Sequence, residues 1–216
     1  IIYEVLTSSD RPNTLHYHAA EHIFKAEDEN AMVVIDSIGL QLGGGTGEQG
    51  KLLGDVDEET ITMEANPLTG VAALHIGQDL WMHCRNDTGA ILYKGDVVMA
   101  TGTLGASGRI LVNYMQGSVP AYAKFLIGVV AETIAIGADG KIQTFGKIHE
   151  FETDGSSLGE TWLDGDVRWV DPVDNGQLTN IEPGATQLGM PIAIVIKSHG
   201  AAGTIFIRHN SIDEHK

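Results

Sequence analysis

Short apolar, β-branched runs separated by glycine-rich turns recur along this chain, and they constrain its fold more than any other feature. Gly accounts for 27 of the 216 residues, and many of these glycines stand between Val/Ile runs of strand length. Runs this short, bounded by turn residues, are typical of strands rather than helices. The sequence therefore predicts an all-β fold, a Gly-rich antiparallel sandwich or barrel.

The sequence Gly-Asp-Val occurs twice in the second half of the chain, at residues 95–97 and 165–167. Each copy opens an apolar run that is followed by a turn and an apolar return. An apolar hairpin follows in each case, around residues 127–142 in the first copy and 192–205 in the second. This order predicts two related β-units that bury their apolar faces against each other.

The domain organisation follows from these patterns. Residues 1–77 are interpreted as a smaller N-terminal attachment or assembly region of mixed structure, residues 78–210 as the duplicated β-domain, and residues 211–216 as a tail. In the N-terminal region, strands are expected at residues 1–7, 31–42 and 60–65, and a short helix at residues 19–29. In the β-domain, only residues 120–125 favour a helical turn.

Composition excludes several classes of function. The formal net charge of −16 disfavours binding to nucleic acid, because the chain repels phosphate backbones. No apolar run approaches the roughly 20 residues of a membrane helix, so no membrane insertion is expected. The single cysteine, Cys84, allows no disulfide within the chain and is expected to be a small buried side chain. The chain begins at Ile1 and not at Met, as a processed product or a fragment would.

Residues 45–51, Gly-Thr-Gly-Glu-Gln-Gly-Lys, have the spacing of a phosphate-binding P-loop. The motif fails at the next position, where Leu52 replaces the hydroxyl that would bind magnesium. The residues that follow do not form an amphipathic helix, so no helix N-terminus is offered to a phosphate. A flexible glycine loop is the favoured interpretation.

Three histidines, His16, His18 and His22, form the pattern H-x-H-x-x-x-H. Imidazole is a common ligand of zinc and nickel, and His18 and His22 would share a face if the segment were helical. The segment shows no further fixed ligand. The three residues are metal-site candidates, but exposed histidines are the favoured interpretation, and no metal or cofactor is expected. A metal-dependent protein that uses these histidines is one of the alternatives.

No catalytic set emerges from the remaining polar residues. The pairs Ser198-His199 and His149-Glu150 are sequence neighbours, and neighbours in a strand point to opposite faces. Glu150 and Glu152 would share a strand face, but solvated strand residues are favoured over an acid pair. Residues 171–176 resemble a calcium loop in composition without its ligand spacing, so a β-turn is expected. Accordingly, no enzyme activity is expected.

Several motifs of the second region occur in one order: IGQDLWMHCRNDTGAI at residues 76–91, GDVV at 95–98, IGVV at 127–130, WLDGDV at 162–167, GQLT at 176–179 and GTIFI at 203–207. Taken together, they resemble a β-domain of tailed-bacteriophage virion proteins. Two departures are Arg168-Trp169, where the family usually has a leucine–tyrosine pair, and Ala193–Val195, where a glycine is usual. The resemblance covers about residues 76–210 and leaves the N-terminal region unexplained.

The resemblance implies a non-enzymatic structural protein located in the virion, of the tail-fibre, spike, collar or capsid-decoration type. Proteins of this kind are commonly homotrimers, and the implied partners are other capsid or tail proteins, with a host-surface glycan as a further candidate. The alternative is a carbohydrate-binding module or glycan-processing protein. That alternative needs an exposed platform from Trp81, Trp162 or Trp169, or two close carboxylates in a groove.

Overall fold

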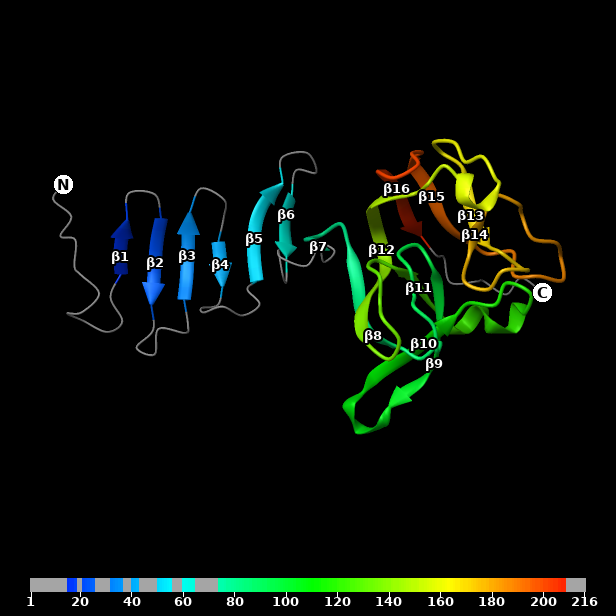
Figure 1. The fold of residues 1–216 in the computed structure, drawn as a ribbon, viewed down its shortest axis with the longest axis horizontal. Helices are drawn as coiled ribbons and strands as arrows, with labels where there is room; N and C mark the ends of the chain where they lie inside the picture. Colours follow the sequence, from blue (N-terminus) through cyan, green and yellow to red (C-terminus); the bar gives the residue numbers. More distant parts are fainter. Residues whose placement is uncertain are drawn as a thin grey trace. The chain divides into compact units, whose positions relative to one another are not determined.

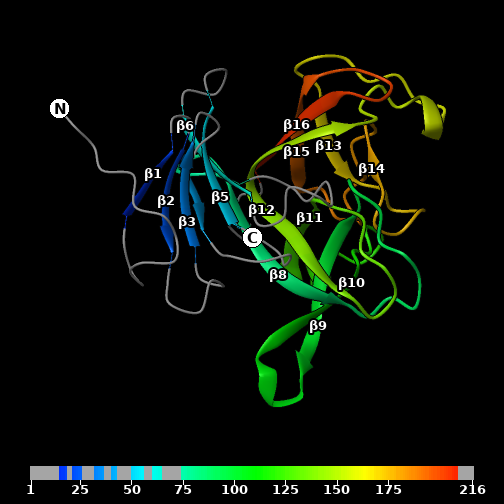
Figure 2. The ribbon, with the colours of Figure 1, turned by 60° about the vertical axis from the view of Figure 1, so that its left-hand side comes forward.

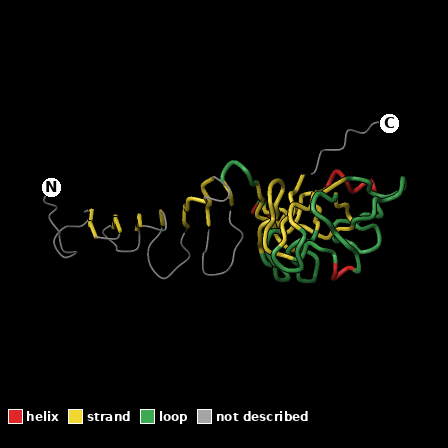
Figure 3. The backbone as a smooth tube through the Cα atoms, turned by 90° about the horizontal axis from the view of Figure 1, so that it is seen from above, coloured by secondary structure: helices red, strands yellow, loops and turns green. Residues whose placement is uncertain are grey.

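The structure is a computed structural model, which describes residues 74–208 continuously and, before them, residues 15–18, 21–25, 32–36, 40–42, 50–55 and 60–64. The chain divides into two compact units, Ile1–Gly77 and Gln78–Lys216. In the part of the chain that is described, strands predominate and helix is confined to short turns (Figure 3). None of the described helices has the length and apolar character needed to cross a membrane.

The first unit contains a seven-stranded antiparallel meander, in which every strand pairs with the next one along the chain (Figure 1). Its strands are β1 (Leu15–His18), β2 (Glu21–Lys25), β3 (Met32–Asp36), β4 (Leu40–Leu42), β5 (Gly50–Asp55), β6 (Thr60–Glu64) and β7 (Leu74–His75). The pairings run from one strand to the next without a register shift.

Two expectations for the first unit are corrected. The helix expected at residues 19–29 is wrong, because residues 21–25 form β2, whose β-branched and aromatic residues pair with β3. The single strand expected at residues 31–42 is two strands, β3 and β4, that pair with each other. The strand expected at residues 60–65 is confirmed as β6. The strand expected at residues 1–7 lies outside the described residues.

The second unit contains nine strands and three short 3₁₀ turns. The strands are β8 (Leu80–Asn86), β9 (Val97–Leu104), β10 (Arg109–Tyr114), β11 (Leu126–Val130), β12 (Asp139–Phe151), β13 (Val167–Val170), β14 (Leu178–Thr179), β15 (Pro191–Lys197) and β16 (Gly203–Arg208). The 3₁₀ turns are η1 (Gly105–Ser107), η2 (Pro120–Phe125) and η3 (Ser156–Leu158). The helical turn expected at residues 120–125 is therefore confirmed.

Five strands of the second unit close into a barrel in the order β11-β9-β10-β8-β12, because β12 pairs with both β8 and β11 (Figure 2). The β10–β8 pairing is parallel and the other four are antiparallel. Each strand supplies one residue to a shared buried cluster: Cys84, Val98, Val112, Val130 and Ile142. The predicted all-β barrel is confirmed, and so is the burial of Cys84.

The remaining strands extend the sheet beyond β12 in the order β16-β15-β13-β14. A larger core lies where this extension packs on the barrel, and it combines Val97 and Val129 of the barrel with Val170, Val195 and Ile207 of the extension. The backbone also joins the two parts, since the Val97 amide donates to the Gly176 carbonyl at 2.7 Å. The barrel and the extension thus share one interior.

Candidate functional site

The two Gly-Asp turns are built from the same hydrogen bonds. In the first, the Asp96 carboxylate accepts from the Tyr93 amide at 2.7 Å. In the second, the Asp166 carboxylate accepts from the Leu163 amide at 2.9 Å. Each turn is closed by a hydrogen bond between residues three apart, so its formation depends on the local sequence alone.

Each turn also exchanges backbone hydrogen bonds with a neighbouring strand, β11 for the first turn and β15 for the second. The Gly95 amide donates to the Val130 carbonyl, and the Val130 amide donates to the Asp96 carbonyl, at 2.9 and 2.8 Å. Gly165, Val195 and Asp166 repeat this exchange at 2.7 and 2.9 Å. The two units therefore share one hydrogen-bonding framework, which places Asp96 and Asp166 at corresponding positions.

A buried cation distinguishes the second turn. The Arg168 side chain is 0% exposed, and its Nη2 donates to the Asp166 carboxylate at 2.8 Å. The guanidinium carbon lies 4.3 Å from the centre of the Trp162 ring, and Trp162 is itself 4% exposed. An arginine held between a carboxylate and an indole face combines ion pairing with cation–π attraction.

Glu160 completes this cluster by accepting three hydrogen bonds. The Thr179 hydroxyl donates to one carboxylate oxygen at 2.5 Å, and the Trp162 indole N–H and the Asn180 amide donate to the other at 2.5 and 2.9 Å. Burial raises the pKa of Glu160, but these hydrogen bonds outweigh it and hold the pKa below its usual value. The cluster of Glu160, Trp162, Asp166 and Arg168 joins β13 and β14 to the loop before them.

The chemistry of this cluster is that of a structural anchor. Burial lowers the pKa of Arg168, and the nearby Asp166 and Glu160 carboxylates oppose that effect. The Nε and Nη1 groups of Arg168 are buried without a hydrogen-bond partner. The Trp162 ring is covered by the guanidinium, so it offers no open platform for a sugar ring.

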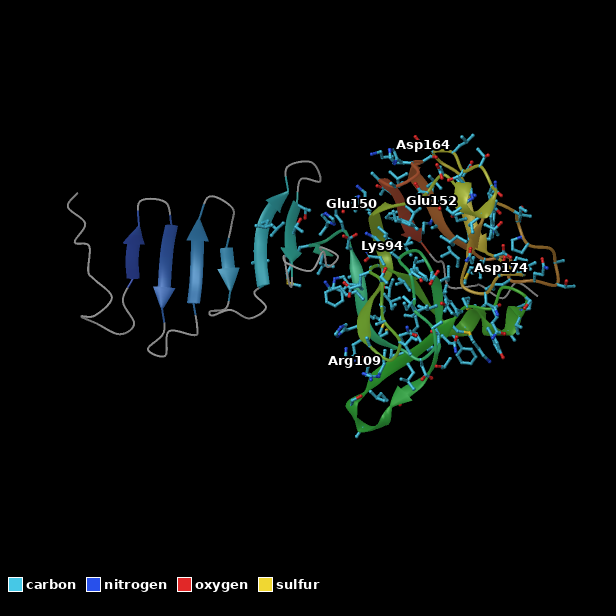
Figure 4. The ribbon with its side chains drawn as sticks, in the orientation of Figure 1. Lys94, Arg109, Glu150, Glu152, Asp164 and Asp174 are labelled. Atoms are coloured by element: carbon cyan, nitrogen blue, oxygen red, sulfur yellow. The ribbon has the colours of Figure 1, made fainter. Side chains whose placement is uncertain are left out.

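A second set of charged groups lies near the end of β12. Glu150 has a φ of 58° where the pairing of β12 with β16 shifts register between His149 and Phe151. Lys94 lies in the field of Glu150; burial lowers the pKa of Lys94 and Glu150 opposes this shift. Figure 4 shows Glu150 and Glu152 near this end of β12 and Asp174 on a separate loop.

Three neighbouring strands form a contiguous apolar strip, in which Leu80 and Phe145 are exposed and Phe206 is half-buried. Leu80 of β8 pairs directly with Phe145 of β12, and these side chains are 63% and 42% exposed. The Phe145 ring packs edge-to-face on Phe206 of β16, with 5.2 Å between the ring centres. Exposed apolar residues that occur singly are ordinary, whereas a contiguous group on a sheet is typical of an interaction surface. The apolar strip consists of Leu80, Phe145 and Phe206.

The histidine candidates are separated by the strand register. Tyr17 pairs with His22, and His18 pairs with Glu21, so His16 and His18 occupy one face of the sheet and His22 the other. The helix that would have brought His18 and His22 to one face is not formed. Among the residues whose side chains are described, no group of three or more His, Cys, Asp or Glu could hold a metal ion.

The other motifs form local structure. Gly50 and Lys51 of the glycine-rich motif begin strand β5, so no helix follows the loop. The Asp171 carboxylate accepts from the amides of Val173 and Asp174 at 2.6 and 3.1 Å, which forms the turn expected at residues 171–176. Residues 45–49 of the glycine-rich motif lie outside the described residues.

The residues considered for hydrolysis are engaged separately. The Ser198 hydroxyl donates to the Trp162 carbonyl at 2.6 Å, and the His199 ring accepts from the amides of residues 201 and 202. Glu152 accepts a hydrogen bond from the Ser157 hydroxyl. The structure does not bring these groups together as a nucleophile with its base or as an acid pair.

Sequence reasoning missed Glu160 and the burial of Arg168. A signal was present in the strand alternation: Arg168 lies two residues from Val170, so both side chains point to the same, buried face of β13. Its burial depends on Trp162 and Asp166, which only the fold brings to it. Comparison with known proteins adds no further residue: no family model, curated protein or solved structure matches the chain.

Proposed function

We propose that this protein is a non-enzymatic structural component of a bacteriophage virion, of the tail-fibre, spike, collar or decoration type. It acts by assembling with copies of itself, as a homotrimer, and by attaching to other proteins of the particle. The observation that carries the proposal is the apolar strip of Leu80, Phe145 and Phe206 on the second unit of an acidic chain. The ordered motifs that resemble virion β-domains support the same function.

The polar groups support this function in a different way. Two charged groups of the second unit, the buried Arg168 and the half-buried Glu160, are bound to neighbouring side chains and fix the fold. Glycan binding through tryptophan is less well supported, because Trp162 is covered by Arg168 and the Trp81 ring lies 5.3 Å from the Lys141 ammonium. What the second unit offers to a partner is therefore an apolar surface.

Light scattering on the purified chain at micromolar concentration tests the proposal. We expect a particle of three times the chain mass. Phe145→Glu should weaken association, because it places a charge in the apolar strip. Phe125→Glu is the matched control, since Phe125 is also 42% exposed and lies on η2 outside the strip. A monomeric wild-type chain would contradict self-assembly, and equal effects of both variants would contradict the role of the strip.

A further inference from the structure

The seven-stranded sheet of the first unit has two faces of different chemistry. Residues that pair directly across antiparallel strands lie on the same side of a sheet, and neighbours along a strand lie on opposite sides. The pairings from β1 to β7 contain no register shift, so they assign every strand residue to one face.

One face is almost entirely apolar and is called the apolar face. Two rows of paired residues cross it, the first from Leu15 to Leu42 and the second from Tyr17 to Leu74. Its residues are Leu15, Tyr17, His22, Phe24, Val33, Ile35, Leu40, Leu42, Gly50, Leu52, Gly54, Ile61, Met63 and Leu74. None of these residues is Asp, Glu, Lys or Arg.

The opposite face, called the charged face, holds every charged residue of these strands. They are Glu21, Lys25, Asp36, Lys51, Asp55 and Glu64. A sheet that divides its residues in this way is amphipathic, and such a sheet needs a second layer against its apolar side.

Side-chain exposure in β6 does not follow polarity. Ile61 lies on the apolar face and is 53% exposed, whereas its neighbour Thr62 lies on the charged face and is 6% exposed. Leu52 and Met63, on the same face as Ile61, are half-buried. An isoleucine left open in this way marks a part of the apolar face that a partner can cover.

We propose that the apolar face packs against the same face of other copies of this chain. This inference rests on the proposed function, because it adds a second surface, besides the apolar strip, through which copies of the chain assemble. The net charge of −16 makes copies of this chain repel each other. The apolar face carries no formally charged residue, so it is a surface at which copies can meet without bringing like charges together.

The size of the face fits such an interface. Seven strands about 4.8 Å apart, with about four residues each on average at about 3.3 Å, form a face of about 30 Å by 14 Å. In a trimer, three such faces turned toward one axis cover about 1,300 Å² of flat area, and side-chain relief adds to the accessible area that is buried. The total exceeds the roughly 1,200 Å² at which specific protein interfaces begin.

Two adjacent valines of β3 provide a matched test. Val33 lies on the apolar face and Val34 on the charged face, so Val33→Glu and Val34→Glu make the same chemical change in the same strand. In the full chain, we expect Val33→Glu to raise the dissociation constant of the assembly at least about tenfold, and Val34→Glu to leave it within about twofold. Sedimentation velocity over a concentration series measures both constants.

Ile61→Glu separates dissociation from unfolding of the sheet. Because Ile61 is 53% exposed in the single chain, its replacement should weaken assembly while far-UV circular dichroism stays unchanged. An assembly that tolerates both Val33→Glu and Ile61→Glu would overturn this inference and leave the proposed function standing. A wild-type chain that is monomeric would overturn both and would point to a different protein as the occupant of the face.

Discussion

The two Gly-Asp units, at residues 95–97 and 165–167, share a hydrogen-bonding framework but surround it with different side chains. Four residues before the aspartate, the first Gly-Asp unit has Leu92 and the second has Trp162. Two residues after the aspartate, the first has Val98 and the second has Arg168. Leu92, Val98 and Arg168 are all 0% exposed, and Trp162 is 4% exposed. Equivalent interior positions are thus apolar in one unit and a cation–π pair in the other.

The closure of the barrel explains the difference. In the first Gly-Asp unit, β11 pairs with β12 and completes a closed barrel whose buried cluster consists of Cys84 and aliphatic side chains. In the second Gly-Asp unit, β14 has only two residues and the sheet stays open. This leaves room for an indole and a guanidinium. A repeat can therefore preserve its turns and strand pairings while its interior changes with the degree of closure.

The largest expected effect is that of Gly128→Ala, which tests the closure itself. A Cβ at Gly128 would lie 2.0 Å from the Gln143 carbonyl oxygen in the neighbouring strand, while the open unit accommodates Ala193 at the equivalent position. We expect a loss of about 5 kcal/mol, or no folded barrel. Gly102→Ala is the control, since its nearest neighbour would be a leucine methyl at 4.0 Å. Urea denaturation that gives the two variants equal stability would contradict a tightly closed barrel.

Replacement of Arg168 tests the interior of the open unit. Arg168→Ala removes a buried guanidinium from the Trp162 ring and the Asp166 carboxylate, and we expect a loss of about 3–4 kcal/mol. Arg168→Met keeps most of the side-chain volume and makes this interior apolar, like that of the first Gly-Asp unit. We therefore expect the free energy of unfolding to fall by less than about 1.5 kcal/mol. Thermal and urea denaturation measure both. If the two variants lose the same stability, the charge rather than the packing holds this unit together.

A smaller effect concerns the pH dependence of the first turn. Burial raises the pKa of Asp96 to about 6, although the hydrogen bond from the Tyr93 backbone opposes the shift. The folded state therefore holds its proton more tightly than the unfolded state, and the stability due to this group is present below about pH 4 and is lost as the pH rises through about 6. Asp96→Asn keeps an acceptor for the Tyr93 amide and removes the titration.

We expect the free energy of unfolding of the wild type to fall, relative to that of Asp96→Asn, by about 1–2 kcal/mol between pH 4 and pH 6. Parallel urea titrations at several pH values measure this difference. Asp166→Asn is the matching substitution in the second Gly-Asp unit. There, loss of the carboxylate charge deprives the buried Arg168 of its ion-pair partner. The two substitutions should therefore change stability in opposite directions near neutral pH, and a common direction would argue against the contrast.

The smallest expected effect is at Glu150, near the end of β12, where the pairing of β12 with β16 shifts register. Its φ of 58° is left-handed, a conformation that costs an L-residue with a long side chain about 1 kcal/mol. Glu150→Gly should raise stability by about that amount. Glu150→Gln is the control for the attraction between Glu150 and Lys94. A melting temperature that falls in Glu150→Gly but not in Glu150→Gln would show that the side chain, apart from its charge, supports the register shift.

Local chemistry made much of the fold predictable. The Gly-Asp turns close through contacts between residues three apart, so Asp96 and Asp166 could be identified from sequence. The helical turn at Pro120–Phe125 and the hairpin of β15 and β16 were predictable for the same reason. In the N-terminal unit, Ile1–Gly77, the β-branched run at residues 31–42 indicated one strand, whereas the structure has two, β3 and β4, that pair with each other.

The sequence by itself determined an acidic, all-β chain with two related Gly-Asp units, because turn closure and strand preference depend on residues close together in the chain. The tertiary structure decided the parallel β10–β8 pairing that helps to close the barrel, the burial of Arg168 against Trp162, and the division of the first sheet into an apolar and a charged face. These features depend on register between distant strands. A shift of one residue would move every side chain to the opposite face, so the alternation within a strand acquires its meaning only when its partner is known.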